Sequence, residues 1–224
     1  MRWREQAFRE VRNQLDRFLN FPVTNPIELG SYGIYNGKRC RFEWRGNLTE
    51  FGIPVPSVGF QTEMQETYAT SNSVLVQSRL SLEDNLPTAD ISFNRTSALL
   101  FRAHDIGYDM AQLNALSQAL TKAISNGMAW DSSFVIVTKV WISRGFTQLV
   151  AGGSKAAVEI KATAPNIQTD FNFANPDIGL NCVLEKNMSY LSIGQSNVRP
   201  YFEMHKLRRD GVSGYSLYKY GLPS

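Results

Sequence analysis

The residues best suited to acid–base chemistry in this 224-residue chain are the neighbours His104 and Asp105. A histidine oriented by a carboxylate can act as a general base, and a serine placed against it would complete a hydrolytic triad. The sequence lacks the Gly-x-Ser-x-Gly turn that presents such a serine in α/β-hydrolases. Adjacent His and Asp residues are also common by chance. We therefore assign the pair no catalytic role.

A second candidate is the run Gly152-Gly153-Ser154-Lys155, which contains the residue types of a phosphate-binding loop. Such a loop requires the order Gly-x-x-x-x-Gly-Lys-Ser/Thr between a strand and a helix. Neither the order nor the context is present. The composition instead favours a turn between two strands.

Metal-binding residue types are few. The two histidines, His104 and His205, are not at ligand spacing from each other or from a cysteine. The two cysteines, Cys40 and Cys182, are expected to be small buried hydrophobes rather than a disulfide. We expect no metal, no cofactor and no enzymatic activity.

Positive charge gathers at the two ends of the chain. Residues 1–20 contain five arginines against three acids, and residues 199–224 contain five Lys or Arg against two acids. The residues between them are close to neutral. Basic ends suit an anionic surface or an acidic partner, although solvated terminal charges give the same pattern. Because the body is not basic, we expect no nucleic-acid partner.

The composition predicts a packed globular protein. Hydrophobic residues make up 43% and aromatic residues 12%, which excludes general disorder. No apolar run reaches the roughly 18 residues of a spanning helix. The first residues have no apolar signal-peptide core, so we expect the chain to be cytoplasmic when inactive.

The first elements are clear from periodicity. Residues 2–20 predict an amphipathic helix, which would either dock on a membrane or partner or pack on its own sheet. Segments 27–35 and 38–44 flank Asn36-Gly37 and predict a hairpin. Residues 58–82 and 90–103 then predict a long, half-polar pair of strands.

A surface helix follows, and we expect Asp109 as its N-cap and Asn126-Gly127 as its stop. A second long pair is predicted over 133–150 and 155–164, joined by the turn at 151–154. Further strands are expected at 180–185, 189–193 and 199–206. The predicted fold class is α+β, mainly an antiparallel twisted sheet with an N-terminal amphipathic helix and a surface helix. One domain covers 1–207, and a flexible tail covers 208–224.

The order of these elements resembles the pore-forming N-terminal domain of gasdermins, in particular the bacterial type. The run Phe134-Val-Ile-Val-Thr-Lys-Val-Trp-Ile142, close behind the surface helix, is similar to the corresponding gasdermin strand. The resemblance covers most of residues 1–200 and consists of diffuse patterns rather than a signature motif. Two features depart from the family: the first cysteine is Cys40 rather than an N-terminal lipid-attachment site, and there is no animal-type inhibitory domain.

The resemblance implies a cell-death effector in bacterial defence that forms a transmembrane β-barrel after proteolysis, with both long hairpins extending into the barrel. Its partners would be an anionic inner (plasma) membrane, further copies of the chain and an activating protease. The tail would be inhibitory. The implied membrane-binding residues are Arg2, Trp3, Arg4, Phe8, Arg9, Arg12 and Arg17. The implied inserting residues are Tyr68, Val74, Val76, Phe93, Leu99, Val140, Trp141, Ile142, Val158 and Ile160. The cleavage site would be Arg208-Arg209.

A second interpretation stays open. Long polar strands and basic ends also fit a structural or assembly protein, such as a β-domain of a virion or a secretion apparatus. A pore former should be monomeric until cleaved, whereas an assembly protein should oligomerise without cleavage and leave membranes sealed.

Overall fold

The chain is a mainly antiparallel β-sheet protein with two short helices. A computed structural model describes residues 2–70, 72–81, 85–163, 172–175, 177, 179–211 and 214–221. The chain consists of two compact units. The first unit comprises Met1–Glu10, Thr62–Ile106 and Ser143–Val198, and the second comprises Val11–Gln61, Gly107–Ile142 and Arg199–Ser224.

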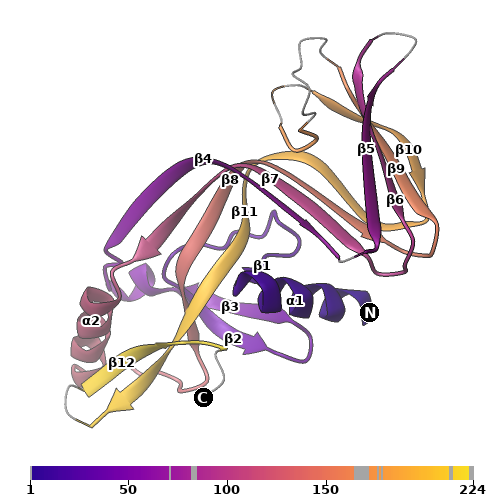
Figure 1. The fold of residues 1–224 in the computed structure, drawn as a ribbon. Coiled ribbons are helices and arrows are strands. Elements are labelled where there is room, and N and C mark those ends of the chain that lie inside the picture. The colour runs from indigo at the N-terminus through magenta and orange to yellow at the C-terminus, as the bar shows by residue number, and fades with distance from the viewer. Residues whose placement is uncertain are drawn as a thin grey trace. The chain divides into compact units, whose positions relative to one another are not determined.

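The strands form two open antiparallel sheets. A four-stranded sheet has the order β10-β9-β6-β5. Its strands are β5 (Val74–Leu80), β6 (Pro87–Phe93), β9 (Ala156–Ala162) and β10 (Leu180–Lys186). All four belong to the first unit and lie side by side (Figure 1).

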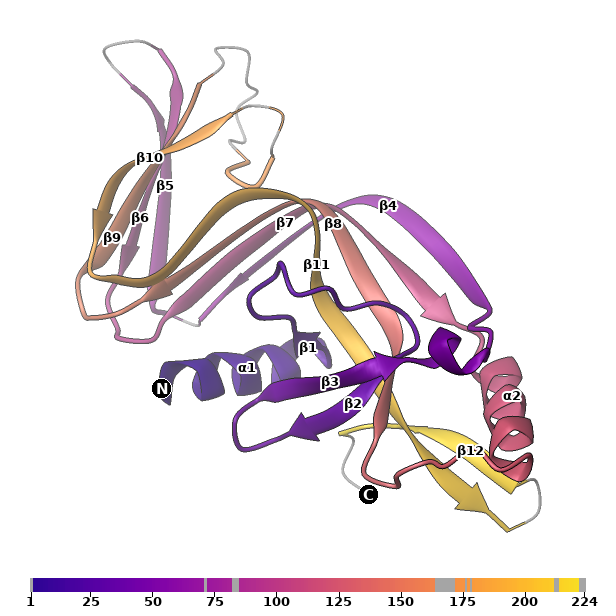
Figure 2. The ribbon, with the colours of Figure 1, turned by 180° about the vertical axis from the view of Figure 1, so that it is seen from behind.

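In the larger, eight-stranded sheet, five strands follow the order β1-β11-β8-β2-β3. In addition, β7 pairs with both β8 and β4, and β12 pairs with β11. These strands are β1 (Phe18–Leu19), β2 (Ser31–Asn36), β3 (Arg41–Asn47), β4 (Ser57–Ala69), β7 (Leu99–Ala111), β8 (Val135–Ala151), β11 (Met188–Asp210) and β12 (Gly214–Lys219). Figure 2, a view from the opposite side, shows that β4, β7, β8 and β11 run beside one another.

The predicted N-terminal helix is present as α1 (Arg2–Leu15), but it is shorter than expected. Asp16 has a φ of 52°, a left-handed conformation that ends the helix. Phe18 and Leu19 then pair with Phe202 and Tyr201 of β11. The stripe that predicted a helix to residue 20 therefore ends in a short strand.

The predicted hairpin around Asn36-Gly37 is confirmed, because β2 and β3 pair antiparallel from Ser31↔Asn47 to Asn36↔Arg41. A short 3-10 helix, η1 (Leu48–Phe51), follows and is capped by Asn47, whose side chain accepts a hydrogen bond from the Thr49 amide.

The surface helix is α2 (Leu113–Ser125), with Leu116 and Leu120 buried. Asp109 is not its N-cap, because β7 continues to Ala111 and Gln112 occupies the cap position without a side-chain hydrogen bond. The predicted stop is correct: the Asn126 amide donates to the Lys122 carbonyl, and Gly127 follows with a φ of 98°.

Both predicted long hairpins differ from the structure. Residues 58–82 form two strands, β4 and β5, that belong to different sheets. The pair predicted over 133–164 likewise splits, because β8 lies in the eight-stranded sheet and β9 in the four-stranded sheet. The turn at 152–155 therefore leads the chain from one sheet to the other. The next strand in sequence, β10, pairs antiparallel with β9.

The tail from residue 208 is also more regular than its composition predicts. Residues 208–210 complete β11, and β12 pairs with it from His205↔Lys219 to Asp210↔Gly214. Backbone hydrogen bonding to β11 outweighs the weak propensity of this Gly-, Ser- and Tyr-containing segment. Cys40 is buried as expected, whereas Cys182 is exposed on β10.

Candidate functional site

The most unusual feature of the first unit is a line of bends shared by four strands. In the eight-stranded sheet β4, β7, β8 and β11 are neighbours in that order, and in the four-stranded sheet the order is β5, β6, β9 and β10. Along the chain, β4, β7, β8 and β11 are each joined to one strand of the four-stranded sheet by five residues or fewer. We call the connecting residues the bend line; they are Thr70, Asn72, Ser73, 94–98, 152–155 and Asn187.

Hydrogen bonds tie the first two connections of the bend line together. The Asn94 amide donates to the Ser73 carbonyl, and the Asn94 side chain donates to the Asn72 carbonyl over 2.9 Å. The Leu99 amide donates to the Thr70 hydroxyl over 3.0 Å.

The remaining connections continue the series. The Ser97 amide donates to the Ala151 carbonyl over 3.0 Å, and the Lys155 amide donates to the Phe93 carbonyl over 3.1 Å. The Gly152 amide then donates to the Asn187 carbonyl over 2.8 Å. Neighbouring strands therefore bend together and stay connected through the bend.

Each of the four connections contains one non-glycine residue in the left-handed region. These residues are Asn72, Ser97, Lys155 and Asn187, with φ values of 53°, 65°, 66° and 54°. A left-handed residue with a Cβ costs roughly 1–2 kcal/mol, and less for asparagine. The bend line therefore holds local strain at four neighbouring points of the sheet.

The four-stranded sheet has one apolar and one charged face. Strand β9 alternates buried Ala156, Val158, Ile160 and Ala162 with partly exposed residues. Ile91 and Phe93 of β6 join these side chains in one core cluster. On the other face Arg79 bridges Asp90 and Glu159, with nitrogen–oxygen distances of 2.5 and 3.4 Å.

The two edges of this sheet are strands β5 and β10, and both expose apolar side chains. Leu75 and Leu80 of β5 are 56% and 61% exposed, and Val183 of β10 is 56% exposed. An edge strand offers unpaired backbone groups that can pair with another strand. The sequence pattern predicts strands in both segments, but it does not show that they form exposed edges.

The ten residues implied to insert into a membrane are found in both units. Tyr68, Val74, Val76, Phe93, Leu99, Val158 and Ile160 lie in the first unit, and Val140, Trp141 and Ile142 lie in the second. All except Val74, Val76 and Ile142 are buried. Tyr68, for example, stacks on Phe101 with ring centroids 4.9 Å apart. In this structure the seven buried side chains form parts of the core.

The implied membrane-binding residues are only partly described. The side chains of Arg2, Trp3 and Arg4 lie outside the described residues, Phe8 is buried and Arg9 is exposed. Arg12 donates to the Gly221 carbonyl and lies 4.7 Å from the Phe18 ring centroid.

Arg17, which follows α1, is enclosed by aromatic rings. Its guanidinium lies 4.4 Å from the Trp141 ring centroid and 5.5 Å from that of Tyr201. Lys139 occupies the same cluster, 4.5 Å from Trp141 and 3.7 Å from Tyr108, and burial lowers the pKa of its ammonium group. Arg12 and Arg17 are therefore used in contacts within the second unit.

The C-terminal residues contact the end of α1. We call β12 with Tyr220 and Gly221 the C-terminal latch. Besides the Arg12–Gly221 hydrogen bond, Lys219 pairs with Asp16 at 2.6 Å and with Glu203 at 3.2 Å. The Tyr220 ring lies 6.2 Å from that of Phe18.

Arg208 and Arg209, the implied cleavage site, are exposed, but their backbone is paired with Ser216 and Tyr215 of β12. The Arg208 guanidinium lies 5.6 Å from the Tyr218 ring. Because proteases bind extended, unpaired chain, cleavage here would require β12 to separate from β11 first.

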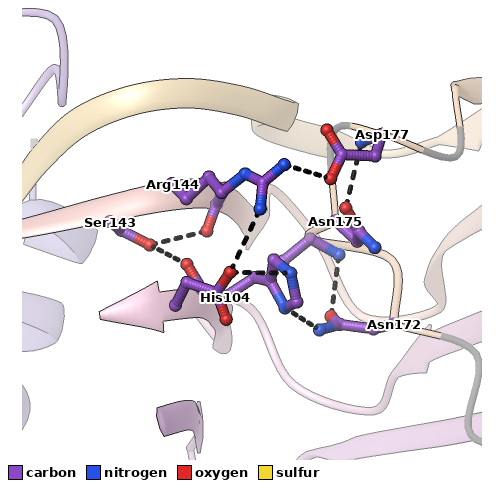
Figure 3. A network of polar contacts seen from close by, with 9 residues as sticks. His104, Ser143, Arg144, Asn172, Asn175 and Asp177 are labelled. Atoms are coloured by element: carbon purple, nitrogen blue, oxygen red, sulfur yellow. Dashed lines mark hydrogen bonds and ion pairs between the residues drawn. The ribbon is translucent and has the colours of Figure 1, made fainter. Parts of the chain in front are cut away.

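The acid–base pair His104–Asp105 is part of a polar network that includes the segment around Asn172 and Asp177 (Figure 3). His104 Nδ1 is 2.9 Å from the Asn172 side-chain nitrogen, and its Nε2 is 3.4 Å from Asp105 Oδ2. Arg144 contacts Asp105 at 3.6 Å and Asp177 at 2.6 Å.

The nearby serine is not arranged as in a hydrolytic triad. The Ser143 hydroxyl lies 2.9 Å from the His104 carbonyl oxygen and 2.7 Å from that of Gly145, and it is fully buried. A triad requires this hydroxyl on an imidazole nitrogen. The network joins Asn172 to His104 and Asp177 to Arg144, and so holds these two residues in place.

Among the described residues, no group of three His, Cys, Asp or Glu side chains is placed to hold a metal ion. None of the helices in the described part of the chain is long and apolar enough to cross a membrane.

The comparisons with known proteins give no family. No protein-family model matches the sequence. No curated protein matches it either.

Proposed function

We propose that this chain is a membrane pore-forming effector that assembles into a transmembrane β-barrel, in the manner of gasdermins. The observation that carries the proposal is the bend line. Four adjacent strands continue through it into four other adjacent strands in the same order. Straightening the bends would join β4 to β5, β6 to β7, β8 to β9 and β10 to β11, which gives two long hairpins.

The need for straightening follows from strand length. Each strand of the four-stranded sheet has seven residues. A transmembrane β-strand requires roughly 9–11 residues. The present strands are too short to cross a bilayer, whereas each strand extended through the bend line is long enough.

The two faces of the four-stranded sheet support the same function. A barrel strand turns apolar side chains to lipid and polar side chains to the lumen. The alternation of Val158 and Ile160 with Glu159 has this character, and Glu159 is joined to Arg79 across the charged face. Exposure of the apolar face would make membrane insertion favourable once the covering residues move away.

The open edges supply the assembly contact. Adding the β5 edge of one copy to the β10 edge of the next is a head-to-tail contact, and such contacts close into rings when the rotation permits. Closure would pair every edge hydrogen-bonding group, as the lipid environment requires.

The C-terminal latch is the proposed control. It occupies Arg12 and covers the end of α1, so its removal would free a basic segment for an anionic bilayer. Each basic residue near such a surface contributes about 1 kcal/mol. We place the intact chain in the cytoplasm and the assembled form at the inner membrane, after an activating protease has removed the latch.

The test is dye release from vesicles that contain phosphatidylglycerol, before and after limited trypsin treatment. The double variant Leu75→Glu/Leu184→Glu charges both exposed edges and should abolish release without changing the far-UV circular dichroism. The matched control, Asn114→Glu/Gln118→Glu, adds the same charge to exposed positions on α2, away from both edges, and should retain release.

Two results would reject the proposal. The trimmed wild-type protein could leave vesicles sealed, or the two double variants could behave alike. Oligomers of the uncut chain in the absence of membrane would favour the structural or assembly protein, because the same edges can join copies without insertion.

A further inference from the structure

The second unit contains a cleft beside the C-terminal latch, which contributes Tyr215 to its lining. It has a volume of about 420 Å³ and lies between α2, the segment 130–132, β11 and β12. Pockets that enclose small molecules are typically about 300–1,000 Å³. The cleft is therefore large enough for a small organic molecule.

Three cations line this cleft: Lys206, Arg208 and Arg209 of β11. Of the nearby carboxylates, Asp131 accepts a hydrogen bond from the Ser133 amide at 2.7 Å, which lowers the pKa of its carboxyl group. Asp210 accepts one from the Ser216 hydroxyl at 3.0 Å. Three cations beside two hydrogen-bonded carboxylates leave the lining positively charged.

The remaining lining is aromatic and apolar. Trp130 and Tyr215 contribute to it, together with Leu207 and the hydroxyl-bearing Ser132. The Trp130 ring is fixed by Tyr32 and Phe134, with centroid distances of 5.6 and 5.4 Å. A ligand that fits both parts has an anionic group and an apolar portion.

Trp130 adds an independent observation. Its indole N–H is buried and has no hydrogen-bond partner within the described part of the chain. A buried donor without a partner costs roughly 1–3 kcal/mol. An acceptor oxygen that reached this N–H from a ligand in the cleft would remove this cost.

We propose that this cleft binds an organic phosphate, with the phosphate oxygens on Arg209 and the apolar portion against Trp130 and Tyr215. Arg209 and Tyr215 are direct cross-strand partners, so their side chains share one face of the sheet. Arginine matches a phosphate with two parallel hydrogen bonds. The same chemistry occurs in a soluble phosphate ester and in the headgroup of a phospholipid. The site does not depend on pore formation, because binding is measured without leakage.

The experiment titrates the full chain with inorganic phosphate, with glycerol 3-phosphate and with phosphatidylglycerol vesicles, using phosphatidylcholine vesicles as a blank. Calorimetry measures binding of the soluble probes, and co-sedimentation measures binding to vesicles. Arg209→Gln should weaken binding by about tenfold or more. Arg45→Gln removes an equal charge from an exposed position on β3 and should have no effect.

Tryptophan fluorescence locates the ligand. Binding should change the emission of the wild type, and Trp130→Phe should remove that change. Saturable binding of glycerol 3-phosphate supports a soluble ligand, and binding to vesicles alone supports a headgroup. The proposal is overturned if no probe binds saturably, or if Arg45→Gln weakens binding as much as Arg209→Gln.

Discussion

Lys219 and Asp16 lie 203 residues apart in the sequence, yet the Lys219 ammonium is 2.6 Å from an Asp16 carboxylate oxygen. Asp16 ends α1, and Lys219 is the last residue of β12. This ion pair therefore links the two basic ends of the chain. The Lys219 and Asp16 charges are therefore paired with each other rather than solvated independently.

Replacing Lys219 with methionine should loosen the C-terminal latch. The Asp16 side chain is 61% exposed, so the pair itself contributes no more than about 1 kcal/mol. Glu203, which is far less exposed, would also lose its partner. We expect a decrease of about 1 kcal/mol in the free energy of unfolding and faster hydrogen exchange in β12. Lys38→Met, at an exposed hairpin turn, is the control. Unchanged exchange in β12 would show that the ion pair does not hold the latch.

The left-handed residues of the bend line predict opposite effects for two kinds of substitution. Lys155→Gly removes the steric cost of a φ of 66° and should stabilise the chain by up to about 1 kcal/mol. Asn187→Val places a β-branched residue at a φ of 54° and should destabilise it by about 1 kcal/mol or more. Thermal unfolding measures both. Under the proposed function, Lys155→Gly should also slow dye release, and a faster release would contradict the role of the bends.

His205 predicts a loss of stability in mild acid. Burial lowers the pKa of its imidazole from 6.5 to about 4, and Lys219 opposite it adds to the effect. Its Nδ1 also lies 2.6 Å from the Thr138 hydroxyl. Between pH 6.5 and 4 the unfolded chain binds more protons at His205 than the folded chain does. The stability that depends on neutral His205 is therefore fully present above pH 6.5 and is lost as the pH decreases toward 4.

The size of this effect is on the order of 1–3 kcal/mol. Urea unfolding of the wild type and of His205→Gln, measured from pH 7 to pH 4, isolates it, since the variant should have the shallower pH dependence. Parallel curves for the two proteins would show that another group is responsible.

Gln148 is an expected weak point of the core. The side chain is 1% exposed, and both of its amide atoms lack a hydrogen-bond partner among the residues that the structure describes. Gln148→Met keeps the length of the side chain and removes both polar atoms. We expect a stabilisation of about 1–3 kcal/mol in urea unfolding. Gln77→Met, at an exposed position, should change stability little. A destabilised Gln148→Met would mean that the amide has a partner in solution.

Local features of the sequence predicted the local elements well. The apolar periodicity of α1 and α2, the Asn36-Gly37 turn and the Asn126-Gly127 stop all appear in the structure. Each of these depends on residues close together in the chain, where backbone geometry and side-chain spacing act directly.

Strand pairing was harder to predict because it depends on residues far apart. Gly152-Gly153 has the composition of a hairpin turn, but β9 pairs with β6 and β10, and its buried side chains pack with Ile91 and Phe93 of β6. The bend line gave a weak signal: Asn72 and Asn187 are residues that tolerate left-handed conformations, whereas Ser97 and Lys155 carry no such preference. The exposed edges became visible only once the strand order was known.

The bend line also limits how the sheet can rearrange. Each connection is hydrogen-bonded to its neighbour, so one strand cannot straighten alone without breaking contacts on the adjoining strands. Partly straightened forms are therefore costly, and the bends should disappear together or not at all. Under the proposed function, the chain would therefore have two states separated by a barrier. The height of that barrier, rather than the overall stability, would set the rate of conversion.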